Sequence, residues 1–321
     1  MPRAEEDSPE QPRAGSRETT PRRSNGGGIW RPTFALTSAL ERRVGGLRPG
    51  RIFDGIGRRA YPAYAESDWN WYEATDRLQF RLNPYYHIDR QVVRLGSYEA
   101  SLTTFMRRTI HPGMTTIDAG ANFGYFTVLM AQRVGPTGRV HAFEPLSHLR
   151  RRCAENLARN ALADRVTLHH EALGDRDAEL TFSFAAPEAS NQGMGSLKLS
   201  SHPMLAEHQT VPVRQLDSLA SDLALERLDF LKADIQGAEI DMLAGAAETI
   251  REFRPMMVLE FSPPEQAAAG RTCVDLADAV IGLGYELHAL RDDGTMGERL
   301  DRRAFEDSSP SDNVVCLPTP R

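Results

Sequence analysis

Residues 116–124 read Thr116-Ile-Asp-Ala-Gly-Ala-Asn-Phe-Gly124, and the fold class follows from this stretch. A short apolar run passes into a glycine-bearing turn (residues 120–124, the glycine turn), and a helical pattern follows at residues 125–133. In open α/β sheets such a turn lets backbone N–H groups approach a ligand at the carboxyl end of the strand. Because Asn122 replaces the second glycine of the dinucleotide fingerprint Gly-x-Gly-x-x-Gly, the turn predicts another nucleotide-type ligand.

Short apolar runs alternate with helical patterns through most of the remaining chain. The predicted strands are residues 116–119, 139–144, 166–170, 230–233, 256–261, 285–290 and 314–317. The predicted helices are residues 125–133, 146–160, 238–252 and 273–283. Near-continuous apolar strands separated by helices are typical of a parallel sheet that is buried on both faces. We therefore predict an α/β fold with a doubly wound, mostly parallel, seven-stranded sheet.

One segment interrupts this alternation, between the third and fourth predicted strands. Residues 180–184 and 211–213 predict an antiparallel hairpin insert, and the polar residues 187–209 join its two strands. A loop of this length is either a plain connection or a flap that covers a ligand at the edge of the sheet.

The N-terminal third differs in composition from the alternating part. Residues 1–28 mix Pro, Ser, Arg and Glu with few apolar residues, which predicts a disordered tail. Residues 29–110 are rich in aromatic residues and arginine, with helices expected at 34–44 and 98–108, and predict a helical cap or substrate region. Residues 111–321 are then expected to form the ligand-binding domain.

Composition excludes several classes of function. The net charge is −6, which argues against a general nucleic-acid binder, and no apolar run approaches the roughly 18 residues of a membrane helix. Cys153, Cys273 and Cys316 are scattered, and His169 and His170 point to opposite faces of one strand, so no metal site is indicated. These features predict a cytoplasmic protein with reduced thiols.

Two acidic residues specify the ligand further. Val140-His-Ala-Phe-Glu-Pro145 ends a strand in Glu144, which lies 20 residues after Gly124, at the spacing where an acid binds a ribose diol. Asp118 directly precedes the glycine turn; it would repel a pyrophosphate but suits an amino-bearing ligand. An adenosine that carries an amino acid is S-adenosylmethionine, the predicted cofactor.

From about residue 98 to residue 260 the chain resembles the FkbM family of S-adenosylmethionine-dependent methyltransferases. The matching segments are Ile117-Asp-Ala-Gly-Ala-Asn-Phe-Gly-Tyr125, Ala142-Phe-Glu-Pro145, Glu171-Ala-Leu-Gly-Asp175, Arg214-Gln-Leu-Asp217, Leu231-Lys-Ala-Asp-Ile-Gln-Gly-Ala-Glu239 and Met242-Leu-Ala-Gly-Ala246. The segment at 231–239 is the one that points to this family in particular, rather than to Rossmann-like methyltransferases in general. Two departures are Ala233, where the family commonly has a larger apolar residue, and residues 1–68, which have no clear counterpart.

The resemblance implies a Rossmann-like class I methyltransferase fold and methyl transfer to a hydroxyl group of a sugar, glycolipid or polyketide-type natural product. The expected partner is thus a small-molecule acceptor. The cofactor-binding residues expected at the matching positions are Asp118, Ala119, Gly120, Ala121, Asn122, Gly124, Tyr125, Glu144, Pro145 and Ala172.

The segment at 231–239 also carries the expected catalytic group, namely Asp234, Lys232, Glu239 and Glu260. Asp234 ends the fourth predicted strand beside the glycine turn, where a carboxylate can take the proton of an acceptor hydroxyl. It could instead hold a divalent cation, contact the cofactor or cap the following helix; no other residue indicates a metal.

Lysine occurs only at positions 198 and 232, and the second of these lies in the specific segment. Lys232 lies two residues before Asp234, on the same face of an extended strand. A buried lysine needs a carboxylate partner, which Glu239 or Glu260 could supply. Two alternatives remain at this point: a nicotinamide-dependent oxidoreductase on a variant Rossmann domain, and a non-catalytic protein that binds an adenosine ligand.

Overall fold

The computed structural model describes residues 69–184, 195–197, 207–306 and 312–320. The predicted tail at 1–28, the helix expected at 34–44 and most of the polar segment 187–209 lie outside these ranges.

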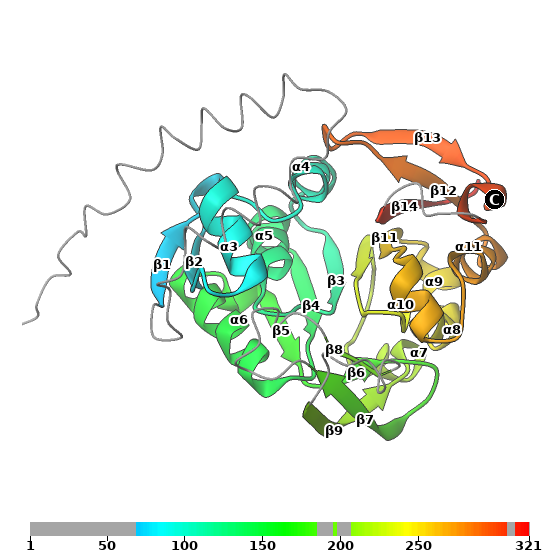
Figure 1. Cartoon of the computed structure of the whole chain (residues 1–321), viewed down its shortest axis with the longest axis horizontal. Coiled ribbons are helices and arrows are strands. Elements are labelled where there is room, and N and C mark those ends of the chain that lie inside the picture. Colours follow the sequence, from blue (N-terminus) through cyan, green and yellow to red (C-terminus); the bar gives the residue numbers. More distant parts are fainter. Residues whose placement is uncertain (1–68, 185–194, 198–206, 307–311, 321) are drawn as a thin grey trace, which may run out of the picture. The chain divides into compact units, whose positions relative to one another are not determined.

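A mixed sheet of eight strands forms the centre of the described fold (Figure 1). In spatial order the strands are β13 (Met296–Leu300), β12 (Tyr285–Leu290), β14 (Asn313–Pro318), β11 (Met256–Glu260), β10 (Phe230–Ala233), β3 (Thr115–Ala119), β4 (Arg139–Phe143) and β5 (Val166–His169). From β11 to β5 neighbouring strands are parallel, whereas β14, β12 and β13 join by antiparallel pairing.

The count of seven strands was therefore wrong, and the strand it omitted is β13. Residues 296–300 read Met-Gly-Glu-Arg-Leu, and only Leu300 among them is buried. An edge strand that faces solvent lacks the continuous apolar pattern by which the buried strands were found.

Helices cover both faces of the sheet, as the doubly wound prediction requires. One face carries α4 (Ala100–Thr109), α5 (Tyr125–Val134) and α6 (Ser147–Arg159). The other carries α7 (Leu216–Leu219), α8 (Glu239–Ala244), α9 (Ala247–Phe253) and α11 (Cys273–Gly282), and α10 (Pro263–Ala268) follows β11. Alternate strand residues divide between two apolar clusters: Phe230 packs with α4 to α6, and Leu231 with α8, α9 and α11.

The single helix expected at 238–252 is two helices, α8 and α9, which are separated at Gly245 and Ala246. A side chain at Gly245 would collide with the backbone oxygen of Gly174, so tertiary packing sets the break. The carboxylate of Asp217 accepts hydrogen bonds from the N–H groups of Glu248 and Thr249 and caps the start of α9.

The described part of the expected helical cap begins with a hairpin. It consists of β1 (Asn70–Glu73), β2 (Gln79–Leu82), α3 (His87–Leu95) and α4. The chain reverses between the two strands through Asp76 and Arg77, both in the left-handed region. The helix expected at 98–108 corresponds to α4, whereas the hairpin and α3 were missed.

The insert forms a separate four-stranded sheet in the order β6 (Ala172–Leu173), β9 (Glu207–Arg214), β7 (Ala178–Phe184) and β8 (Gly195–Ser196). Strands β7 and β9 pair antiparallel, which confirms the predicted hairpin.

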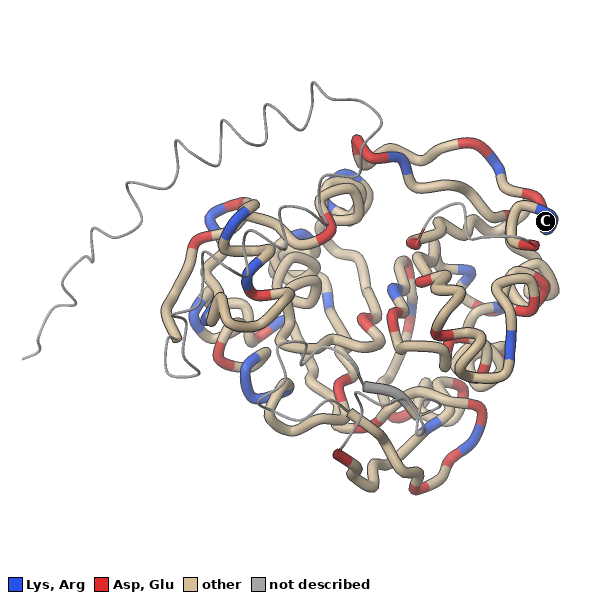
Figure 2. Tube along the Cα trace, viewed as in Figure 1, with Lys and Arg blue, Asp and Glu red and all other residues tan. Residues whose placement is uncertain are grey.

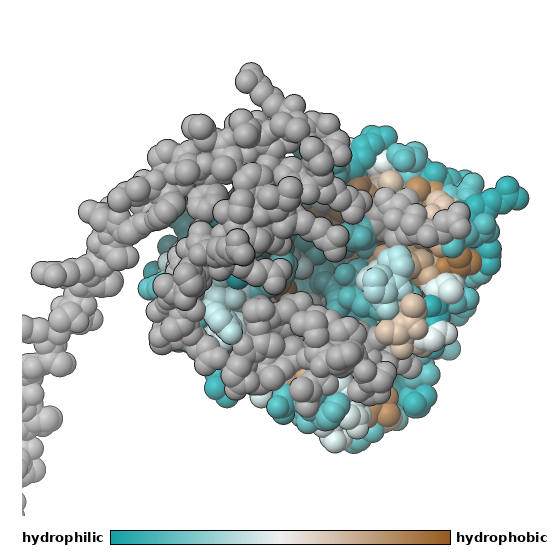
Figure 3. Space-filling view, viewed as in Figure 1, coloured by the Kyte–Doolittle hydropathy of each residue, from teal (hydrophilic) through white to brown (hydrophobic). Residues whose placement is uncertain are grey.

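Acidic and basic positions are interspersed along the described chain (Figure 2). The described surface in Figure 3 is largely hydrophilic, with small separate hydrophobic areas. Within the described ranges, no helix has the length and apolar character needed to cross a membrane.

Candidate functional site

A cavity of about 320 Å³ opens at the carboxyl ends of β3, β4, β10 and β11. This is the place where open α/β sheets bind their ligands. The glycine turn forms one wall, Asp234 and Glu260 lie at the ends of β10 and β11, and the insert contributes Phe182 and Leu197. Tyr98 lines the cavity from the segment before α4. Several segments that are distant in sequence therefore enclose one site.

The conformation of the glycine turn explains its sequence. Gly120 has φ +80°, and a Cβ atom there would collide with the carbonyl oxygen of Asp234. The N–H groups of Gly120 and Ala121 both donate to the carbonyl oxygen of Phe143. Asn122 is also left-handed, at φ +53°, and its side-chain oxygen accepts the N–H of Phe123 at 2.7 Å. The turn is thus fixed against the ends of β4 and β10.

Most of the predicted cofactor-binding residues line this cavity. They are Ala119, Gly120, Ala121, Asn122, Tyr125, Glu144, Pro145 and Ala172. Gly124 and Asp118 do not belong to the lining: Gly124 packs against Cys153 at the start of α5, and Asp118 is buried beneath the turn.

Glu144 lines the cavity and also braces the turn. Its Oε2 accepts the N–H of Asn122 and its Oε1 accepts the N–H of Leu146, both at 2.9 Å. Burial raises the pKa of Glu144 to about 7, although both backbone hydrogen bonds oppose the shift. Each carboxylate oxygen can accept more than one hydrogen bond, so the group can still bind a diol.

The carboxylates nearest to Lys232 are Asp118 and Asp234. Its Nζ lies 3.5 Å from Oδ1 of Asp118 and 3.7 Å from Oδ2 of Asp234, and its side chain is only 3% exposed. Lys232 and Asp118 are register partners on the neighbouring parallel strands β10 and β3, so their side chains share a face. Asp118 also accepts a hydrogen bond from Oγ1 of Thr127 at 2.6 Å.

This arrangement corrects two expectations. Lys232 takes its partner from the adjacent strand β3, rather than from Glu239 or Glu260. Asp118, which was expected to face the amino group of a ligand, instead faces Lys232 and Thr127 behind the wall of the cavity. Although burial opposes it, the two carboxylates raise the pKa of Lys232, so this lysine stays charged.

Glu239 lies outside the cavity lining and is 1% exposed. Its carboxylate accepts the N–H groups of Ile235 and Gly237 and a hydrogen bond from Nε2 of Gln266. Glu239 therefore holds the loop between β10 and α8 in place.

Asp234 and Glu260 line the cavity side by side. Nε2 of Gln236 donates to Oδ1 of Asp234 at 3.0 Å and to Oε2 of Glu260 at 3.1 Å, and the two carboxyl groups hydrogen-bond each other. Although burial opposes it, the Lys232 ammonium lowers the pKa of Asp234. Burial and the charge of Asp234 raise the pKa of Glu260 well above its usual range. Asp234 is thus the ionised member and Glu260 the protonated member of the pair.

Sequence reasoning missed Tyr98 and Glu99. The Glu99 carboxylate accepts hydrogen bonds from Nδ2 of Asn313, at 3.0 Å, and from the Tyr98 hydroxyl. Burial and the charge of Asp234 raise the pKa of Glu99 to about 7. Its backbone is left-handed, at φ +40°, a strained conformation for glutamate. No periodic pattern marks this position, because it depends on the packing of α4 against β14.

The cavity has a size that suits a small-molecule ligand. Its lining combines Glu144 with apolar side chains, namely Phe143, Leu149, Leu173, Phe182 and Leu197. Among the described residues, no group of three or more His, Cys, Asp and Glu side chains is arranged to hold a metal ion.

The family model described as the Methyltransferase FkbM domain matches residues 118–291, which include every predicted site residue. The chain belongs to the FkbM methyltransferase family. The methyl donor of this family is S-adenosylmethionine, so the described fold is an S-adenosylmethionine-dependent methyltransferase domain. This membership sets the oxidoreductase alternative aside.

Two curated proteins are similar to this FkbM methyltransferase domain. The AMB antimetabolite synthetase AmbE of Pseudomonas aeruginosa is 32% identical over 212 residues, 56% of this chain and 10% of that protein. The 2-O-methyltransferase NoeI of Sinorhizobium fredii is 29% identical over 164 residues, 48% of this chain and 65% of that protein. The chain thus spans less than two thirds of the length of either relative.

A solved structure, the methyltransferase FkbM of Methylobacillus flagellatus, is 19% identical at a TM-score of 0.40. The match covers 64% of this chain and 43% of that one.

Proposed function

We propose that this protein transfers the methyl group of S-adenosylmethionine to a hydroxyl group of a small molecule, such as a sugar, a glycolipid or a polyketide-type natural product. The observation that carries the proposal is Asp234, an ionised carboxylate that lines the cavity beside the glycine turn. The relative whose printed name is 2-O-methyltransferase supports an oxygen acceptor.

The cofactor would bind in the part of the cavity that Glu144 lines. Its carboxylate would hold the ribose hydroxyls, and the backbone of Gly120 and Ala121 would lie along the ligand. The apolar side chains of Phe143 and Phe182 would enclose the base. When bound, the cofactor supplies a methyl group that its sulfonium has already activated. The protein therefore needs chiefly to align this group with the acceptor and exclude water.

The acceptor end of the cavity contains Asp234, Glu260 and Tyr98. We infer that Asp234 accepts a hydrogen bond from the acceptor hydroxyl and takes its proton as the oxygen bonds to the methyl carbon and the carbon–sulfur bond breaks. Lys232 keeps Asp234 ionised, and the Glu260 carboxyl donates a hydrogen bond that fixes its orientation. Asp118 contributes indirectly, because it holds Lys232.

The first experiment is to follow label from methyl-labelled S-adenosylmethionine into a small-molecule extract and identify the product by mass spectrometry. Asp234→Asn should reduce turnover by about 100-fold or more while the cofactor dissociation constant changes by less than about threefold. Asp222→Asn, at an exposed position, is the matched control. Failure of the wild-type protein to bind S-adenosylmethionine would reject the proposal. Normal turnover by Asp234→Asn would reject only the role of Asp234.

A further inference from the structure

Two asparagines one turn apart, Asn156 on α6 and Asn160 at its C-cap, bind the open edge of strand β2. Oδ1 of Asn156 accepts the N–H of Arg81 at 2.8 Å, and Oδ1 of Asn160 accepts the N–H of Gln79 at 2.9 Å. Nδ2 of Asn160 also donates to the carbonyl oxygen of Gln79 at 2.7 Å. Two side chains of one helix thus pair with the strand much as a neighbouring strand would.

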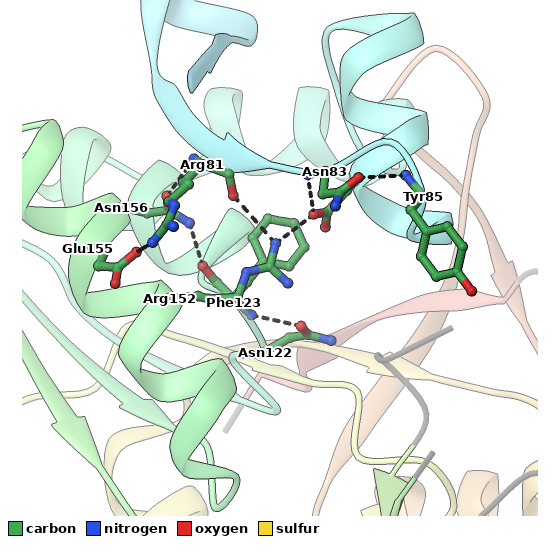
Figure 4. Close-up of polar contacts among 9 residues, drawn as sticks. Arg81, Asn83, Tyr85, Asn122, Phe123, Arg152, Glu155 and Asn156 are labelled. Atoms are coloured by element: carbon green, nitrogen blue, oxygen red, sulfur yellow. Dashed lines mark hydrogen bonds and ion pairs between the residues drawn. The ribbon is translucent and has the colours of Figure 1, made fainter. Parts of the chain in front are cut away.

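The two asparagines differ in what else they contact. Nδ2 of Asn156 donates to the carbonyl oxygen of Phe123 at 2.9 Å, as Figure 4 shows, and its side chain is fully buried. Phe123 follows the left-handed residue Asn122, whose N–H is bound by Glu144. A single amide group therefore connects β2 to the part of the glycine turn that lines the cavity.

Arg152, one turn before Asn156 on α6, makes a second connection between the same parts (Figure 4). Its guanidinium carbon lies 4.7 Å from the ring centroid of Phe123 and 4.6 Å from that of Trp69. Its Nη2 pairs with Oδ2 of Asp89 at 2.7 Å, and that carboxylate also accepts the N–H of Asn83. The guanidinium thus contacts both the Trp69 ring and the Phe123 ring of the glycine turn.

We propose that residues 69–95 belong functionally to the cofactor site, and that Asn156 and Arg152 are positioning residues that hold the Asn122–Phe123 peptide in its binding conformation. This inference rests on the proposed use of S-adenosylmethionine. The physical reason is the backbone at Asn122: asparagine tolerates the left-handed region better than most residues, yet the conformation still costs free energy, and the contacts to Phe123 hold the peptide that follows it. Without these contacts, the turn would relax away from the geometry that presents its backbone to the cavity.

Asn156→Ala and Asn160→Ala form a matched pair that separates positioning from stability. Asn156→Ala loses one hydrogen bond to β2 and Asn160→Ala loses two, but only Asn156→Ala also leaves the carbonyl oxygen of Phe123 without its partner. Both should lower the melting temperature. The dissociation constant for S-adenosylmethionine, measured by calorimetry where both variants are folded, should rise about tenfold in Asn156→Ala and less than about twofold in Asn160→Ala.

Arg152→Met and Arg151→Met form a second pair of variants. If Asn156→Ala fails to fold, this pair tests whether contacts to Phe123 affect cofactor affinity. Arg151 is the exposed neighbour on the same helix. Arg152→Met should weaken binding of S-adenosylmethionine at least fivefold, whereas Arg151→Met should leave it unchanged.

Equal cofactor affinity within each pair that folds would overturn the inference while leaving the proposed function intact. A wild-type protein that binds no S-adenosylmethionine would overturn both.

Discussion

Replacing Asp118 with asparagine tests whether this residue acts on Lys232 or on the ligand. The substitution keeps an acceptor for Thr127 but removes the charge 3.5 Å from the ammonium. At that separation, the gross attraction is about 5 kcal/mol for an effective dielectric constant of about 20. Asp234 remains 3.7 Å from the ammonium and retains part of this stabilisation. Breaking the pair should therefore lower the free energy of unfolding by about 2–4 kcal/mol.

Urea unfolding measures this loss, and an unchanged m-value would show that only stability has altered. Asp278→Asn is the control, because the ion pair between Asp278 and Arg302 is exposed and its loss should leave the urea midpoint unchanged. A stability within about 0.5 kcal/mol of the wild-type value would refute the role of Asp118 as the anchor of Lys232. If cofactor binding were lost at the same time, Asp118 would contact the ligand after all.

Three further outcomes are expected. Glu144→Gln should weaken S-adenosylmethionine binding at least about tenfold in calorimetry, because the amide replaces one acceptor oxygen by an NH₂ donor, which can accept a hydrogen bond neither from a ribose hydroxyl nor from the backbone N–H that this oxygen now binds. The pKa of Glu99 is raised from 4.5 to about 7, so the folded state holds its proton more tightly and stability should fall as pH rises from about 4.5 to 7. Glu99→Gln should flatten that part of the stability curve, measured by urea unfolding at several pH values. Lys232→Arg should lower both the melting temperature and turnover, because a larger cation must enter a site that is 3% exposed beside Phe126; full activity would show that a compact ammonium is unnecessary.

The sequence was informative where the chemistry is local. The strand, turn and helix around Gly120 lie within 20 residues, so the apolar pattern and the glycines predicted them correctly. Two-residue periodicity likewise placed Lys232 and Asp234 on one face of β10, and the structure confirms that they meet. The position of Glu144 at the cavity followed from its distance to the turn.

Features that depend on the order of the strands in the sheet could not be predicted from local sequence patterns. Asp118 meets Lys232 because β3 lies beside β10, and the two residues are more than a hundred positions apart. Glu99 becomes partly buried only where the start of α4 meets Asn313 of β14, and the break between α8 and α9 depends on the close approach of Gly245 to Gly174. In each case, the partner that decides the structure comes from a distant segment.

The asparagines beside β2 also bear on pairing between strands of different molecules. A two-stranded hairpin such as β1 and β2 has an outer edge whose free N–H and carbonyl groups can template a strand from another molecule. Asn156 binds the N–H of Arg81, and Asn160 binds both the N–H and the carbonyl oxygen of Gln79, while Nη2 of Arg152 contacts the carbonyl oxygen of Arg81. An asparagine every fourth residue of a helix thus closes a sheet edge without a further strand, and loss of either one would expose a site for intermolecular β-pairing.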